Sequence, residues 1–302
     1  MCALLFACAT QTLATASKRR PQVTKPAVLA PGELQKLPAR PPDHRLAYGA
    51  DPNQFGELRL PAGRGPHPVA VLVHGGCWKA EYATLRDLAA MGDALKDEEI
   101  ASWNVEYRRP RQQGSGWPGT YLDVGHAIDY LRQLATKFDL DLSRVVVVGH
   151  SAGGHLAMWS GARQRLSSKS ALRVPDPLLL RGVINLAGTI DMTENIANME
   201  SRCRDTVVTT LLGGTPSAVP ERYREVSATA MLPLQVPQIL IWGEHEDFVP
   251  LPLAERYVNK ATEAGDKTRL IVVPATGHFE SASPASTAWP TVLGAIRSFL
   301  NK

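Results

Sequence analysis

One serine stands where a nucleophile could be activated. Ser151 is the middle residue of the G-x-S-x-G pentapeptide GHSAG at 149–153. Four valines at 145–148 precede it and predict a strand buried on both faces, and an apolar run from His155 predicts a helix after it. A strand, a tight glycine turn and a helix form the context in which a catalytic serine is held above a sheet. The alternative interpretation is a purely structural turn between a strand and a helix.

A serine hydroxyl needs a base to take its proton and a third group to orient that base. Two loops supply the missing residue types. Asp247 follows one predicted buried strand, and His278 follows the next. Both lie past the carboxyl end of a strand, the edge where open α/β sheets bind ligands. The sequence therefore predicts Ser151 as nucleophile, His278 as base and Asp247 as the acid that orients it.

Other residues compete for two of these roles. His245 is the rival base, although it stands beside the predicted acid in the sequence. Glu244 and Glu246 are near enough to replace Asp247. His150 occupies the variable position of the pentapeptide, where a packing residue is expected rather than a base.

Taken together, the motifs resemble those of the α/β-hydrolase esterases and lipases, close to the group of kynurenine formamidases and small carboxylesterases. The resemblance covers nearly all of residues 45–302 and implies the Ser…Asp…His chain order of that fold. It also implies that the acid opens a D-x-x-V-P motif, a position that we assign to Asp247 rather than to either neighbouring glutamate.

The stretch HGGCW at 74–78 resembles the oxyanion motif of this family, in the H-G-G-x-W form of the kynurenine formamidases. Glycines let backbone N–H groups approach the oxygen that becomes negatively charged. The donors that the resemblance implies are the N–H groups of Gly75, Gly76, Cys77 and Ala152. Trp78 is expected to line the substrate pocket.

The elements that must position these groups alternate along the chain. Strands are expected at 44–50, 56–60, 68–73, 100–107, 144–149, 181–187, 237–242 and 270–273. Helices are expected at 82–96, 119–137, 153–165, 251–264 and 285–300. This alternation predicts one α/β domain over 43–302, with a doubly wound, mostly parallel sheet of about eight strands. Residues 188–232 interrupt the pattern and are predicted to form a small lid insertion.

Composition and charge exclude some classes of function. The 302 residues are 44% hydrophobic and 21% charged, which is ordinary for a globular protein. The net charge of +4 comes from residues 1–42, which hold six basic residues and one acidic residue. The body has no basic excess, so a nucleic-acid partner is not expected. The oligomeric state stays open, a homodimer included.

The first 42 residues differ from the body. Residues 1–17 are apolar or small and resemble a secretory signal or a lipoprotein leader, so we expect export, with a cytoplasmic location as the alternative. Residues 18–42 hold six prolines and are predicted to be an extended linker. No apolar run is long enough to span a membrane.

Cys77 and Cys203 are far apart in the sequence, and two free thiols are expected rather than a disulfide. No metal-ligand spacing is present, and neither a metal nor another cofactor is expected. The function that these residues predict is hydrolysis of small carboxylic esters through an acyl-enzyme. Hydrolysis of an aryl formamide is the alternative, and a non-catalytic binding module is the alternative from another class. Because the 188–232 insertion is polar, short acyl chains are expected to be preferred.

Overall fold

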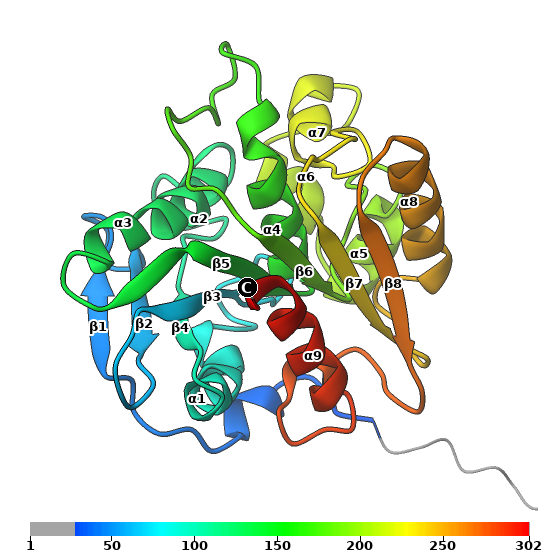
Figure 1. Ribbon diagram of the computed structural model, residues 1–302. Helices are drawn as coiled ribbons and strands as arrows, with labels where there is room; N and C mark the ends of the chain where they lie inside the picture. The colour runs from blue at the N-terminus through cyan, green and yellow to red at the C-terminus, as the bar shows by residue number, and fades with distance from the viewer. Residues whose placement is uncertain (1–27, 302) are drawn as a thin grey trace, which may run out of the picture.

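The computed structural model describes residues 28–301, and one mixed sheet forms its centre (Figure 1). Across the sheet the strands follow the order β1-β2-β4-β3-β5-β6-β7-β8. Their bounds are His44–Ala47 (β1), Phe55–Arg59 (β2), His67–Val73 (β3), Ala101–Val105 (β4), Leu140–His150 (β5), Gly182–Leu186 (β6), Gln238–Gly243 (β7) and Thr268–Val273 (β8). β2 runs antiparallel to β1 and β4, and the other neighbouring pairs are parallel. The prediction of a mostly parallel sheet of about eight strands is confirmed.

The valines of β5 show how one strand serves two cores. Val145 and Val147 belong to the hydrophobic core on one face of the sheet, and Val146 and Val148 belong to the core on the other. All four are fully buried. Because successive side chains of a strand point to opposite faces, a strand with helices on both sides must be apolar throughout.

Helices cover both faces of the sheet, as the doubly wound prediction requires. Met91 of α1 and Ile296 of α9 lie in one core, and Val124 of α2, Leu156 of α4 and Tyr257 of α8 lie in the other. The helix bounds are Ala89–Asp97 (α1), Gly119–Asp129 (α2), Leu131–Leu134 (α3), Ala152–Ala162 (α4), Ile196–Cys203 (α5), Val207–Leu212 (α6), Pro220–Val226 (α7), Leu251–Glu263 (α8) and Trp289–Leu300 (α9). Within residues 28–301, no helix is long and apolar enough to cross a membrane.

The insertion at 188–232 is more ordered than its sequence pattern suggests. It holds the three short helices α5, α6 and α7, which lie beside α4 and α8 in Figure 1. Their buried residues, such as Met199 and Leu211, join the core that contains α4. The insertion therefore shares the hydrophobic core of the domain.

The segment 28–42 corrects the prediction of an extended linker. Leu34, in the 3-10 turn Leu34–Lys36, is 1% exposed and packs into the core beneath α1 and α9. Arg40 forms ion pairs of 2.7 Å with Asp93 and with Asp97. The three leucines of this segment, at 29, 34 and 37, are spaced among prolines without a regular period, so sequence pattern could not reveal this docking. The predicted leader at 1–17, and residues 18–27, lie outside the described part.

Candidate active site

Ser151 occupies the sharp turn between β5 and α4, as predicted. Its backbone adopts φ 53° and ψ −120°, a region that non-glycine residues rarely enter and that costs energy to hold. Glycines are required on both sides of Ser151 because neighbouring backbone atoms lie too close to leave room for a Cβ. A Cβ at Gly149 would lie 2.0 Å from the carbonyl oxygen of Gly153, and one at Gly153 would lie 2.0 Å from that of Val73. The strained turn presents Ser151 at the carboxyl end of β5.

Ser151 and His278 line the same cavity, which has a volume of about 800 Å³. The loop after β3 contributes Gly76 and Cys77 to its wall, and the insertion contributes Arg202. The volume lies within the roughly 300–1,000 Å³ of typical ligand sites. The structure thus brings the predicted nucleophile, the predicted base and the predicted oxyanion loop together.

Glu246 holds His278. Its two carboxylate oxygens lie 2.9 and 2.8 Å from Nδ1 of His278, and its side chain is 0% exposed. The same carboxylate accepts the backbone N–H groups of Phe248 at 2.7 Å and Val249 at 2.9 Å. Glu246 therefore fixes the orientation of the imidazole, and in the described part of the chain no hydrogen bond engages Nε2.

The structure corrects the prediction that Asp247 orients His278. The Asp247 side chain is 57% exposed, and its carboxylate pairs with Nη1 of Arg202 at 3.1 Å. Consecutive residues of the loop after β7 face opposite ways, so only Glu246 faces the base. The sequence did contain a signal for Glu246. In the D-x-x-V-P motif the acid stands three residues before the valine, and Glu246, not Asp247, has this spacing to Val249-Pro250.

His150 contacts the backbone of His278. Its Nε2–H donates to the carbonyl oxygen of His278 at 2.9 Å. Burial, together with the nearby His278, lowers the pKa of His150 from 6.5 to about 3, so the ring stays neutral. Phe248 stacks on the His278 ring at 4.3 Å between centroids. The rival base His245 lies on the outer part of the acid loop, with Glu244 at 4.0 Å.

The loop after β3 approaches Ser151 closely. A Cβ at Gly75 would lie 3.0 Å from Cβ of Ser151, so a larger residue there would displace the nucleophile. Gly76 has φ 96°, and a Cβ at this position would lie 2.5 Å from Cβ of Ala83. Within residues 28–301, no hydrogen bond is donated by the backbone N–H of Gly76 or Cys77. These groups are free to bind an oxygen beside Ser151.

Ala152 completes this set of donors. It is the first residue of α4, where backbone N–H groups have no acceptor within the helix. A partial positive charge also gathers at a helix N-terminus. Its position directly after Ser151 suits the oxyanion hole that the sequence predicts.

Known proteins match this chain over most of its length. The model of the BD-FAE family matches residues 57–260. The chain belongs to the BD-FAE family. Esterase LipC of Mycobacterium tuberculosis is 27% identical over 270 residues, which cover 85% of this chain and 64% of LipC. Human Carboxylesterase 3 is 32% identical over 167 residues, which cover 48% of this chain and 26% of that protein. This BD-FAE chain thus spans less than two thirds of these relatives.

Solved structures share the fold. A truncated carbohydrate esterase from gut microbiota superposes with a TM-score of 0.72 at 22% identity, covering 85% of this chain and 95% of that one. Esterase B from Lactobacillus rhamnosis gives a TM-score of 0.73 at 20% identity, covering 88% and 89%. The α/β-hydrolase fold predicted for this BD-FAE member is confirmed.

A buried ionic network supports the loop after β3 in this BD-FAE chain. Nε2 of His74 lies 3.0 Å from the carboxylate of Glu106, which also pairs with Arg109 at 2.8 Å. Burial acts to raise the pKa of Glu106, but its contacts with His74 and Arg109 act against this, and the pKa of Glu106 is lowered overall. Tyr107 donates its O–H to the His74 carbonyl at 2.8 Å. The network holds the loop without reaching the cavity.

Trp78 was predicted to line the substrate pocket, but it does not line the cavity that contains Ser151. Both Cys77 and Trp78 adopt positive φ, at 53° and 52°, which turns the Trp78 side chain into the core. Its indole is fully buried and meets the His155 ring edge-on at 5.4 Å. The positive φ values at Cys77 and Trp78 therefore accompany the burial of Trp78 outside the cavity that contains Ser151.

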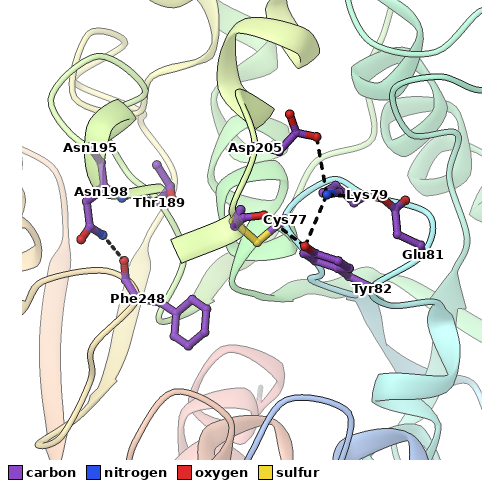
Figure 2. The surroundings of a disulfide bond; sticks show 10 residues. Cys77, Lys79, Glu81, Tyr82, Thr189, Asn195, Asn198, Asp205 and Phe248 are labelled. Carbon is purple, nitrogen blue, oxygen red and sulfur yellow. Dashed lines mark hydrogen bonds and ion pairs between the residues drawn. A yellow bond between two sulfur atoms is a disulfide. The ribbon is translucent and has the colours of Figure 1, made fainter. Parts of the chain in front are cut away.

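Cys77 and Cys203 form a disulfide, with 5.9 Å between their Cα atoms, so the expectation of two free thiols is wrong. The bond ties the oxyanion loop to the end of α5. Figure 2 shows Lys79 beside it, 3.5 Å from Asp205, while the Tyr82 O–H donates to the Cys203 carbonyl at 3.1 Å. Cysteines 126 residues apart carry no local signal of pairing.

Proposed function

We propose that this chain is a serine esterase in which Ser151 attacks, His278 transfers the proton and Glu246 orients His278. The observation that carries the proposal is the contact of both Glu246 oxygens with Nδ1 of His278. It leaves Nε2 as the nitrogen available in the cavity that also contains Ser151. A base whose second nitrogen is fixed by a buried carboxylate is what a serine nucleophile requires.

The reaction follows from this arrangement. His278 takes the Ser151 proton as the hydroxyl oxygen attacks the ester carbonyl, and the carbonyl oxygen becomes an oxyanion. Backbone N–H groups of Gly76, Cys77 and Ala152 bind that oxyanion. His278 then gives its proton to the departing alcohol, and water releases the acyl group by the reverse use of the same groups. Glu246 holds the ring in place and stabilises the imidazolium that forms.

The proposed substrates are small carboxylic esters with short acyl chains. The insertion side of the cavity carries Ser201, Arg202 and Arg204, which suit a short acyl group better than a long apolar one. The relatives named esterases support an ester over a formamide. An aryl formamide would use the same groups, so it is the comparison substrate in the test.

A fluorophosphonate probe and two substrates test the proposal. The probe should label wild-type protein but not Ser151→Ala, and p-nitrophenyl acetate should be hydrolysed faster than N-formylaniline. Loss of the nucleophile should lower kcat by about 10⁴–10⁶-fold. A Ser151→Ala variant that keeps a tenth of the activity would overturn the assignment, and faster formamide hydrolysis would overturn the substrate class.

We also propose that the chain is exported. The Cys77–Cys203 disulfide supports this location, because disulfides persist in oxidising compartments. Mass analysis of the protein from its native source, alkylated without reduction, should find both thiols protected. Two alkylated thiols would argue for the cytoplasm instead.

A further inference from the structure

A second, smaller cavity adjoins the one that contains Ser151. Its volume is about 240 Å³. The two cavities share the lining residues Pro31, Asp247, Phe248, His278 and Phe279. The small cavity is also lined by the rest of the segment 28–31. Within residues 28–301, Ser151 does not line the small cavity. The small cavity therefore lies on the side of the base, away from the nucleophile and the oxyanion loop.

The segment 28–31 is fixed where it forms this wall. The carboxylate of Glu280 accepts the backbone N–H of Leu29 and, at 2.8 Å, that of Gly277, which directly precedes His278. A Cβ at Gly277 would lie 3.2 Å from Cβ of Val28, so the two backbones fit closely. One buried carboxylate thus joins the N-terminal wall to the loop of the base.

The small cavity is mostly apolar and large enough for a ring. Val28, Leu29, Pro31, Phe248 and Phe279 supply the large apolar side chains of its lining, and His245, Asp247 and His278 supply the polar ones. The volume of about 240 Å³ exceeds the roughly 150 Å³ of an apolar cavity that can hold benzene. The side chain of Val28 is 43% exposed. An apolar group entering the cavity would cover it.

We propose that this small cavity is the subsite for the alcohol part of the ester, and that it favours alcohols ending in an aromatic ring. The inference rests on the proposed function, because it uses His278 as the acid that protonates the leaving oxygen. That step requires the departing alcohol to lie beside His278 and not beside the oxyanion loop. The segment 28–31 is then a specificity-determining part of the site.

Two acetate esters with different alcohols test the contribution of the alcohol part of the substrate to kcat/KM. Ethyl acetate and 2-phenylethyl acetate share the acyl group and are both esters of primary alcohols, so they differ mainly in what the alcohol can contact. The wild-type ratio of kcat/KM should favour 2-phenylethyl acetate by about tenfold or more, the scale of a small apolar group placed in a fitted pocket. Ala30→Trp, which fills the cavity, and Val28→Ser, which removes apolar contact, should each lower this ratio severalfold.

A matched control separates this effect from a general loss of surface hydrophobicity. Val272 in β8 is 39% exposed, like Val28, but lies outside both cavities. Val272→Ser should keep the wild-type ratio. If Ala30→Trp misfolds, Val28→Ser decides alone, since its side chain is partly in solvent and its backbone contacts remain.

The outcomes distinguish the two proposals. If wild-type protein hydrolyses neither acetate and takes no fluorophosphonate label, the proposed function itself fails. If both acetates are hydrolysed with a ratio near one, or the Val28→Ser ratio equals that of Val272→Ser, the esterase proposal stands and the alcohol subsite is overturned.

Discussion

Residues 28–301 contain two buried pairs of a glutamate and a histidine, and only one of the two histidines lines the cavity that contains Ser151. Glu246 lies 2.8 Å from Nδ1 of His278, and Glu106 lies 3.0 Å from Nε2 of His74. Each histidine follows the end of a parallel strand, β8 and β3, and each side chain is buried. By residue type, burial and distance the two pairs are nearly alike.

They differ in what the second ring nitrogen meets. Nδ1 of His74 lies 2.9 Å from the Gly75 carbonyl oxygen, so both of its ring nitrogens face acceptors. Nε2 of His278 remains available in the cavity with Ser151. A carboxylate–histidine pair becomes a catalytic device only if its other nitrogen is open to the nucleophile. Otherwise the same pair is a structural brace.

Of the two pairs, Glu246–His278 should give the larger effect when it is broken. Glu246→Gln should lower kcat by about 10³–10⁴-fold, because the amide cannot stabilise the imidazolium and can impose the wrong tautomer. The neighbouring Asp247→Asn is the matched control, since Asp247 also lines the cavity but pairs with Arg202 and makes no hydrogen bond to His278. Steady-state ester hydrolysis measures both. Equal losses in the two variants would restore Asp247 as a candidate acid.

Breaking the structural pair should affect stability first. Glu106→Gln leaves Arg109 buried without its counter-charge, so the free energy of unfolding should fall by about 3–5 kcal/mol. The exposed pair Glu98–Arg297 provides the control, and Glu98→Gln should cost at most about 1 kcal/mol. Urea unfolding followed by tryptophan fluorescence gives both values. A Glu106→Gln protein as stable as Glu98→Gln would show that the brace is not needed.

Two further buried histidines have no carboxylate partner and should make stability depend on pH. His150 and His155 donate Nε2–H to backbone carbonyls, and burial lowers the pKa of each from 6.5 to about 3. Below pH 6.5 both histidines are protonated in the unfolded chain but remain neutral in the folded chain. The free energy of unfolding therefore decreases as the pH falls toward 3. The slope should approach about 1.4 kcal/mol per pH unit for each histidine.

Urea titrations between pH 6.5 and pH 5 measure this slope. His155→Gln should remove about half of it, whereas the exposed His126→Gln should leave it unchanged. A wild-type slope near zero would mean that these two rings are protonated in the folded protein.

Residues fixed by local pattern were predictable from the sequence. Ser151 lies in a strand–glycine–helix motif, and the β5 valines specify burial on both faces. Residue type alone does not decide between Glu246 and Asp247, but the spacing to Val249-Pro250 favours Glu246, and the loop turns that side chain toward His278. The docking of Leu34 and the burial of Trp78 depend on a non-periodic contact and on positive φ values. The pairing of Cys77 with Cys203 depends on the tertiary fold.

That disulfide also determines how the molecule would respond to mechanical tension. A force applied at the two ends of the chain would pass directly from Cys77 to Cys203, whose separation in sequence is 126 residues. At about 3.5 Å per extended residue, some 400 Å of chain would be shielded from extension until the bond is reduced. Ser151 lies inside the shielded length, whereas Glu246 and His278 lie outside it. Pulling would therefore separate the nucleophile from its base before it stretched the strand that carries the nucleophile.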